Sequence, residues 1–308
     1  MRWGIGRDRY VVTPGLYAVG SPSPESPVMV TANYKMTFDL VRRDLKGYDA
    51  WVLVLDTKGI NVWCAAGKGT FGTDELVKRI ASSRLAEVVK HRKLILPQYG
   101  AVGVAGHTVR KESGFQVTYG PIRSADLSGF LAADGQATEG MRTTSFTLYE
   151  RFILTPVEFT VLWKEIAWAL PVLLLLGGIG EHVFSLSAAW NRGIGAWLIA
   201  LLGVFSGAVL TPVLLPWLPG RAFSFKGALV SGVVGLSAAL LWVDGLGLLN
   251  AIATILTVGA VGSYCAMNFT GSTPFTSPSG VEHEMRRAIP LQLAAQLVAG
   301  VLWVWTAF

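Results

Sequence analysis

Apolar and polar positions follow different patterns in the two halves of the chain. In the first half, short apolar runs alternate with amphipathic stretches, whereas in the second half long apolar runs follow one another closely. Short apolar runs bounded by turn residues are typical of buried strands, and runs of about 20 apolar residues are typical of membrane-spanning helices. The pattern therefore predicts an α/β domain followed by an all-α transmembrane domain.

The first half alternates between strands and helices from Lys35 onward. The apolar run at residues 50–56 predicts a buried parallel strand, and residues 73–92 predict a helix with Thr73 as its N-cap. Further strands are predicted at 93–97, 115–119 and 142–148, with helices at 107–113 and 124–133. This alternation is typical of a Rossmann-like parallel sheet with helices on its faces.

The N-terminal residues have a different composition. Residues 13–30 contain four prolines with several serines and glycines, which favours an extended arm over a packed element. The first ten residues are charged and have no apolar core of a signal peptide, so the α/β domain is expected to stay in the cytoplasm. We therefore predict an arm at 1–30, a cytoplasmic α/β domain at 31–155 and a transmembrane domain at 156–308.

Five apolar segments are long enough to cross a bilayer. They lie at about 163–180, 192–217, 225–243, 246–268 and 288–307. Glycine pairs such as Gly203/Gly207 and Gly232/Gly235 would allow close helix contact. We expect no charged residue in the central part of any span, which argues against an ion-coupled transporter.

Basic residues in the short loops predict the orientation in the membrane. With the α/β domain inside, the inner loops contain Arg221, Lys226, Arg286 and Arg287, and the outer loops contain Arg192 alone. The excess of positive charge on the inner side predicts a multi-pass protein of the cell (inner) membrane whose N-terminal domain is cytoplasmic. Membrane lipid is thus an expected partner.

Charge also separates the two halves. Of the 26 Lys and Arg, 20 precede Lys164, as do 15 of the 20 Asp and Glu. The isoelectric point is about 9.4, but the basic residues are scattered and form no basic strip interleaved with aromatic residues. Nucleic acid is therefore not an expected partner.

The two cysteines are expected to lie in different phases, so a disulfide between them is not expected. Cys265 lies in the fourth apolar segment and is interpreted as a packing residue. Cys64 follows the strand at 50–56 and precedes the helix at 73–92, and the small residues Ala65, Ala66 and Gly67 would let a broad, flat ligand approach the backbone. Because a thiolate is a soft ligand for transition metals, Cys64 is the candidate for chemistry, although a lone cysteine is more often a core residue.

The octet Asn61-Val62-Trp63-Cys64-Ala65-Ala66-Gly67-Lys68, with residues 57–60 before it and 69–73 after it, closely resembles the signature of the mercury-methylating corrinoid protein family (HgcA). A soluble corrinoid domain followed by about five membrane spans is also that family's layout. The resemblance covers nearly all of the chain beyond the first 30 residues. It implies that residues 31–155 bind a cobalamin-type corrinoid and that Cys64 is the lower axial ligand to its cobalt.

The resemblance also implies an activity and partners. The implied enzyme is a corrinoid-dependent methyltransferase of anaerobic metabolism that transfers a methyl group from methyl-cobalt(III) to inorganic Hg(II), giving methylmercury. Because the chain has no cysteine cluster for an iron–sulfur centre, electrons are expected from a ferredoxin-like iron–sulfur protein. A folate-linked methyltransferase is expected to supply the methyl group.

The expected cofactor contacts lie in two segments that follow strands. They are Thr57, Asn61, Val62, Trp63, Ala65, Ala66, Gly67, Lys68, Gly100, Gly103 and His107. Simpler interpretations are a packing residue for Trp63, a turn residue for Asn61 and a solvated charge for Lys68. For His107 we favour a solvent-facing position at a helix end over a contact with the cofactor tail.

Other functions stay open at this point. A corrinoid methyl carrier of one-carbon metabolism with another acceptor would use the same cofactor. A membrane transport or sensor protein with a nucleotide-binding domain is a third possibility, because residues 67–72 fit G-x-G-x-x-G. That motif normally follows its strand directly, and about ten residues intervene here, so nucleotide binding is disfavoured. A mercury-relay role for Cys265 with Met267 is a further, disfavoured alternative.

Overall fold

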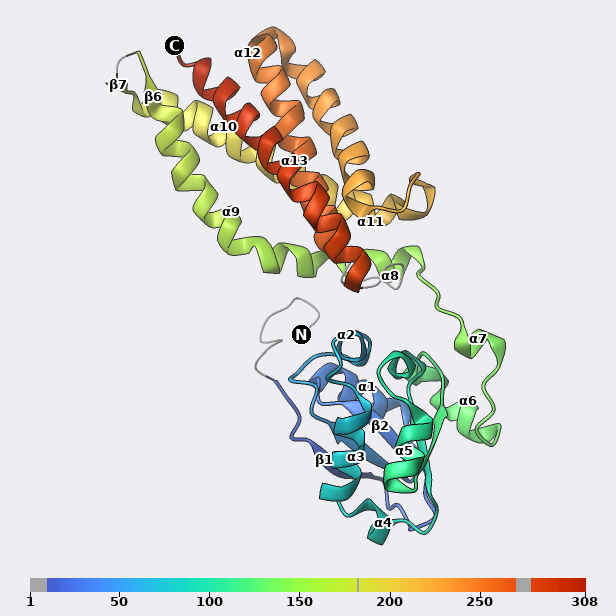
Figure 1. Cartoon of the computed structure of the whole chain (residues 1–308). Helices are drawn as coiled ribbons and strands as arrows, with labels where there is room; N and C mark the ends of the chain where they lie inside the picture. Colours follow the sequence, from blue (N-terminus) through green and yellow to red (C-terminus); the bar gives the residue numbers. More distant parts are fainter. Residues whose placement is uncertain (1–9, 182, 270–277) are drawn as a thin grey trace. The chain divides into compact units, whose positions relative to one another are not determined.

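The computed structural model of the chain describes residues 10–181, 183–269 and 278–308, and it divides into two compact units between Ser145 and Phe146 (Figure 1). The first unit is the α/β domain, and the second contains the long apolar helices. The predicted α/β fold of the first half and the helical, apolar character of the second half are therefore present, while membrane insertion stays a prediction.

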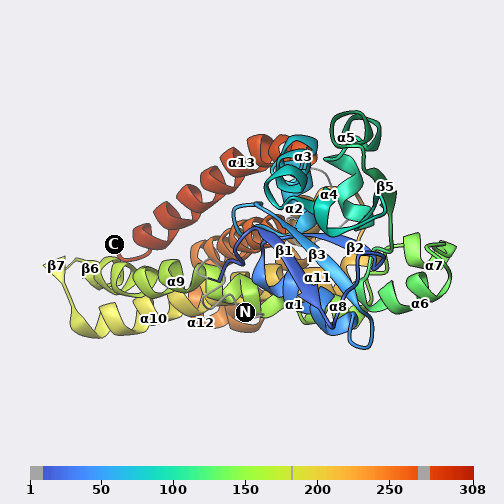
Figure 2. The same ribbon diagram turned by 90° about the horizontal axis from the view of Figure 1, so that it is seen from below.

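The sheet of the first unit has the strand order β1-β3-β2-β4-β5. Its strands are β1 (Gly15–Val19), β2 (Val28–Ala32), β3 (Ala50–Leu55), β4 (Lys93–Leu96) and β5 (Gln116–Tyr119). β2 through β5 are parallel, and β1 adds to the edge in the antiparallel direction, so the sheet is mixed and not wholly parallel as predicted. Figure 2 shows β1, β3 and β2 side by side.

The predicted N-terminal arm is wrong for much of its length. Residues 15–19 form the edge strand, and Val28–Ala32 forms the central strand of the sheet, buried at all five positions. Three of the four prolines that suggested an arm lie in the connection between these strands, where Lys90 donates from its backbone N–H to the carbonyl of Pro24, and the fourth, Pro14, directly precedes β1. A short apolar strand next to prolines has too few residues for a periodic signal.

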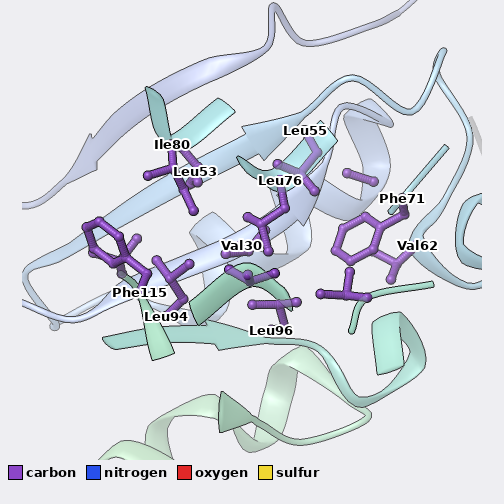
Figure 3. Packing of buried hydrophobic residues seen from close by; sticks show 14 of the residues in the cluster. Val30, Leu53, Leu55, Val62, Phe71, Leu76, Ile80, Leu94, Leu96 and Phe115 are labelled. Carbon is purple, nitrogen blue, oxygen red and sulfur yellow. The ribbon is translucent and has the colours of Figure 1, made fainter. Parts of the chain in front are cut away.

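Two apolar cores flank the sheet because alternate strand residues point to opposite faces. On one face, Val30 and Leu53 pack with Leu76 and Ile80 of α3 (Thr73–Ser82), as Figure 3 shows. On the other face, Met29 and Val52 pack with α1 (Lys35–Asp44) and α6 (Leu127–Ala132).

Several predicted elements differ in detail from the structure. The helix predicted at 73–92 is α3 followed by a separate turn, α4 (Leu85–Val88), because Arg84 adopts a left-handed conformation between them. The predicted strand at 142–148 is absent from the described residues. That stretch joins the short helices α7 (Glu139–Arg142) and α8 (Leu148–Phe152). With no neighbouring strand to pair with, an alternating pattern does not form a strand.

Asp44, at the end of α1, is expected to contribute to stability above pH 4. Its carboxylate accepts hydrogen bonds from Arg43 Nε (2.6 Å) and from Ser124 Oγ (2.6 Å), and the Arg43 guanidinium holds its pKa below the usual value. A lowered folded-state pKa means that this stabilisation is present above the unfolded-state pKa and is lost as the pH falls through the folded-state pKa. Asp44→Asn should therefore cost about 1 kcal/mol near pH 7 and less at pH 3. Thermal unfolding of the detergent-solubilised chain across pH 3–7 would measure this, with Glu112→Gln as an exposed control, and an equal cost at both pH values would contradict it.

The second unit contains five segments long and apolar enough to cross a membrane. They are Leu148–Gly178, Leu186–Trp217, Phe223–Leu241, Gly247–Asn268 and Gly280–Trp305. They derive from α8, α9 (Thr155–Gly178), α10 (Leu186–Phe205), α11 (Thr211–Leu214), α12 (Phe223–Asn268) and α13 (Pro278–Trp305), and α12 is broken at Gly247. A hairpin of β6 (Ile179–Gly180) and β7 (Val183–Phe184) joins α9 to α10. The predicted number of apolar helices is confirmed, while their orientation stays a prediction.

The first apolar helix begins earlier than predicted. Thr155 starts α9, so Lys164 and Glu165, expected at the beginning of the first span, lie near the middle of the Leu148–Gly178 segment. Buried Arg151 lies near the start of the same segment, in α8, and donates to the carbonyls of Pro212 (3.2 Å) and Val213 (2.6 Å). Residues 166–178 of this segment contain no charged side chain, so the absence of charge from the middle of the first span stays a prediction.

Glycines allow close helix contact in this unit as predicted, with one exception. A Cβ on Gly207 would meet the carbonyl oxygen of Gly262 at 2.2 Å, and one on Gly203 would meet Val261 Cβ at 2.8 Å. Gly235 packs against Ile255, but Gly232 has no atom within 4 Å of its Cβ position. Thus α10 and the following π-helical turn approach α12 through Gly203 and Gly207.

Candidate functional site

Cys64 lies in a short helix, α2 (Val62–Gly67), which was not predicted from the sequence. Asn61 is the N-cap of this helix, since its side-chain oxygen accepts a hydrogen bond from the Cys64 N–H at 3.0 Å. Asparagine is among the preferred N-cap residues because it satisfies a backbone donor that has no partner within the helix. Asn61 is therefore a capping residue that fixes the backbone at Cys64.

The short helix α2 has a buried and an exposed side. Val62, Ala65 and Ala66 face the core and are at most 7% exposed. Trp63 and Cys64 are partly exposed, and Gly67 and Lys68 are exposed. The octet thus divides into residues that anchor the helix and residues that a ligand can reach.

The segment after α2 holds the helix against the domain. The backbone N–H groups of Thr70 and Phe71 both donate to the Ala65 carbonyl, at 2.9 and 3.1 Å. Phe71 is fully buried, and Figure 3 shows its ring beside Val62 at one end of the core cluster. Within the G-x-G-x-x-G pattern, residues 67–69 are exposed, whereas Phe71 and Gly72 are buried, and Gly72 is the N-cap of α3. Thr73, predicted as that N-cap, instead accepts a hydrogen bond from the Ala105 N–H at 2.9 Å.

The second glycine-containing segment forms the 3₁₀-helix η1 (Gln98–Val102) at the carboxyl end of β4, and it packs against α2. A Cβ on Gly103 would lie 2.2 Å from the Phe71 carbonyl oxygen and 3.1 Å from Ala66 Cα, and one on Gly100 would lie 2.5 Å from the Phe71 ring. Both glycines were predicted as cofactor contacts. In the structure, they let η1 pack closely on α2 and Phe71.

Two further predicted contact residues lie in different surroundings. Thr57 is fully buried, and its hydroxyl is 2.8 Å from Asn33 Oδ1 and 2.6 Å from the Ile60 carbonyl oxygen. A buried hydroxyl with these neighbours supports the turn before α2. His107 is exposed in the first turn of α5 (Gly106–Ser113), which agrees with its interpretation as a helix-end residue.

An apolar, partly exposed surface surrounds the accessible side of α2. The rings of Trp63 and Tyr99 lie 6.5 Å apart, and Val102 on η1 is 81% exposed. A free, partly exposed thiol beside exposed apolar side chains and glycines at the carboxyl edge of a sheet suits a flat macrocycle that carries a metal. The residues present therefore fit a corrinoid, and Cys64 would hold its cobalt.

Two polar residues at this edge, Gln98 and Tyr119, are not among the expected cofactor contacts. The side-chain carbonyl oxygen of Gln98 is buried with no hydrogen-bond partner among the described residues. Tyr119, at the end of β5, donates to the Val104 carbonyl at 2.6 Å, and burial raises its pKa. Their position directly at the carboxyl ends of strands was the only sequence signal available.

Cys265 is 1% exposed and packs with Val204 and Ala208, which agrees with its interpretation as a packing residue. Across the described ranges, no three His, Cys, Asp or Glu side chains form a group that could hold a metal ion. A metal bound at Cys64 would thus need most of its ligands from a cofactor.

Residues 7–131 match the family model described as CO dehydrogenase/acetyl-CoA synthase delta subunit. Acetyl-CoA decarbonylase/synthase complex subunit gamma of Archaeoglobus fulgidus is 34% identical over 122 residues, which is 39% of this chain and 26% of that protein. The subunit of the same name from Methanopyrus kandleri is 34% identical over 131 residues, covering 42% and 28% of the two chains. That of Methanosarcina acetivorans is 32% identical over 124 residues, covering 39% and 26%.

The match is confined to the α/β part of the chain. The chain spans about a quarter of the length of these relatives, and its apolar helices lie outside the matched residues. The relatives' names refer to acetyl-CoA chemistry and not to mercury, so mercury methylation stays a prediction. The α/β domain of this chain is thus similar to part of the subunits of the acetyl-CoA decarbonylase/synthase complex.

Proposed function

We propose that this chain is a membrane-anchored corrinoid protein that passes a methyl group to an acceptor. The observation that supports this most directly is the placement of Cys64 on the accessible side of a capped helix, at the carboxyl edge of the sheet and beside exposed apolar residues. Similarity to acetyl-CoA decarbonylase/synthase subunits supports the same class, because acetyl-CoA chemistry of this kind handles one-carbon units.

When bound, the corrinoid would supply a cobalt that accepts and releases a methyl group. Cys64 would bind this cobalt, and its thiolate would donate electron density to the metal, as a thiolate does to haem iron. Trp63, Tyr99 and Val102 would cover apolar parts of the macrocycle, while Lys68 is exposed where it can approach polar groups at its rim.

Mercury(II) is our proposed acceptor. The octet around Cys64 closely resembles the signature of the mercury-methylating family, and a soft electrophile suits a methyl group made electron-rich by a thiolate ligand. The second candidate, a methyl carrier with another one-carbon acceptor, is favoured by the names of the relatives. Because these relatives match only the α/β part, their complete role does not carry over to this chain.

The proposed methyl transfer also needs an electron donor, a methyl donor and an anchor in the membrane. A ferredoxin-like protein would provide electrons, a folate-linked methyltransferase would provide the methyl group, and the helices would anchor the α/β domain on the cytoplasmic side of the membrane. A nucleotide-binding sensor is disfavoured because the G-x-G-x-x-G residues do not follow β3 directly: the first glycine, Gly67, is the last residue of α2, and the last glycine, Gly72, is the N-cap of α3.

A methyl-transfer assay tests the proposal. The full chain would be purified anaerobically in detergent with corrinoid, and its cobalt content would be measured. Isotope-labelled methyl groups on the loaded protein would then be followed with Hg(II) or with a thiol acceptor such as coenzyme A. We expect about one cobalt per chain and labelled methylmercury. Cobalt with transfer to coenzyme A alone would favour the second candidate, and a folded protein without cobalt would contradict both.

A further inference from the structure

The turn between β3 and α2 has an unfavourable backbone conformation. Lys58 and Gly59 are both left-handed, with φ of 56° and 73°, and the Ile60 N–H closes the turn on the Thr57 carbonyl at 3.2 Å. Glycine adopts this conformation readily, but lysine does so at a cost, and such residues persist where the surrounding structure holds them. This turn leads directly into Asn61, the N-cap of the helix that presents Cys64.

The side chain of Asn33 holds this turn in place. Asn33 follows the last residue of β2 and is 1% exposed. Its Oδ1 accepts hydrogen bonds from the backbone N–H groups of Thr57 and Gly59, each at 3.0 Å, and the Thr57 hydroxyl lies 2.8 Å away. One buried oxygen therefore accepts hydrogen bonds from the residues immediately before and after Lys58, the residue with the unfavourable conformation.

The amide nitrogen of Asn33 acts as a hydrogen-bond donor on the opposite side of the side chain. Asn33 Nδ2 donates to Asp56 Oδ1 at 3.2 Å, and that oxygen also accepts the Lys58 N–H at 3.1 Å. An aspartate at position 33 could accept from the turn but would place a carboxylate oxygen against Asp56. An aliphatic residue would leave buried N–H groups without a partner. Only a side chain with an acceptor and a donor fits both sets of contacts.

We propose that Asn33 is a positioning residue for Cys64. Through its hydrogen bonds to the turn at residues 57–60, Asn33 fixes the position and orientation of α2 relative to the sheet. The role of Cys64 as a cobalt ligand rests on the proposed function, whereas the hydrogen bonds by which Asn33 positions α2 do not depend on a cofactor. Asn33 lies far from Cys64 in the sequence and outside the octet, yet it would determine whether the thiol meets the cobalt in the correct geometry.

The experiment compares four variants of the full chain with the wild type. Asn33→Ala removes both contacts, and Asn33→Asp removes the donor. The double variant Asn33→Asp/Asp56→Asn exchanges donor and acceptor and can restore the hydrogen bond. Thr31→Val is the matched control, because Thr31 lies on β2 two residues before Asn33, is 1% exposed and has a buried hydroxyl with no partner among the described residues.

The first readout uses the protein without cofactor. Alkylation of Cys64 by iodoacetamide and hydrogen exchange of the α2 amides would be followed by mass spectrometry, with buried Cys265 as an internal reference. We expect both rates at Cys64 and α2 to rise by about tenfold in Asn33→Ala and Asn33→Asp, the factor that corresponds to about 1.4 kcal/mol of local opening. The double variant should return toward the wild-type rate, and Thr31→Val should not change it.

The second readout is the visible spectrum of the corrinoid-loaded protein. The thiolate-dependent band should weaken or shift in Asn33→Asp and return in the double variant. Wild-type alkylation and exchange rates in folded Asn33→Ala would overturn the inference. If Asn33→Ala does not fold, the inference would be overturned by a double variant whose Cys64 is alkylated as fast as that of Asn33→Asp. A failure of the wild type to bind cobalt would count against the proposed function and leave the first readout valid.

Discussion

Replacing Cys64 by alanine is expected to reduce methyl transfer by about 100-fold or more, since even partners of a metal ligand contribute 10- to 100-fold. The thiolate is the only protein ligand to cobalt in the proposed site, and alanine offers no lone pair in its place. Cys64 is partly exposed on α2, so its loss leaves little cavity and should change the free energy of unfolding by about 0.5 kcal/mol or less. Cys64→Ala should therefore lose methyl transfer while keeping nearly the wild-type free energy of unfolding.

Visible spectroscopy, cobalt content and methyl transfer of the full chain would be measured together. Cys265→Ala is the matched control, because it removes the other cysteine from the apolar helices and leaves the proposed site intact. Serine at position 64 tests the need for sulfur, since a hydroxyl is a harder and weaker ligand for a late transition metal. Unchanged transfer and an unchanged spectrum in Cys64→Ala would remove Cys64 from the mechanism.

Replacing Gly103 by alanine is expected to displace α2 and to lower the free energy of unfolding by about 3 kcal/mol, the upper end for overpacking. Gly103 has φ −99° and ψ −16°, which alanine adopts without strain, so the whole effect comes from the added methyl group. That methyl group would lie 2.2 Å from the Phe71 carbonyl oxygen and 3.1 Å from Ala66 Cα. Both are backbone atoms and cannot rotate away.

Thermal unfolding and hydrogen exchange of α2 would measure this effect, and cobalt content would report its consequence for the site. Gly140→Ala is the control in the same unit, because its Cβ would make only an ordinary contact, 3.9 Å from Thr138 Oγ1. An unchanged melting temperature and normal cobalt binding in Gly103→Ala would show that η1 can move away from α2. The close contact would then be dispensable for the position of Cys64.

Elements with a strong local pattern were predicted well from the sequence. The strands at 50–56, 93–97 and 115–119 correspond to β3, β4 and β5 within one residue at each end, and the five apolar helices are all present. Long or strongly apolar runs can be assigned to helices or strands because the side chains that must be buried recur at the spacing of that element. The same reasoning missed β2, a five-residue strand whose burial depends on neighbours on both sides.

The sequence alone singled out Cys64 and the small residues after it, because a soft ligand between a strand and a helix has a recognisable context. Tertiary structure alone decided which of the surrounding residues can meet a ligand. Thr57, Gly100 and Gly103 were assigned to the cofactor from their position in the chain, but Thr57 is buried in the turn and the two glycines pack against Phe71 and α2.

What the sequence determined by itself was the α/β fold of the first unit, the five apolar helices of the second, the approximate limits of most elements and the candidate thiol. What only the tertiary structure decided was the central place of β2, the helical state of residues 62–67 and the contacts of Asn33 and Gly103. The physical reason is that periodicity and capping are local, whereas these features depend on atoms brought together from distant parts of the chain.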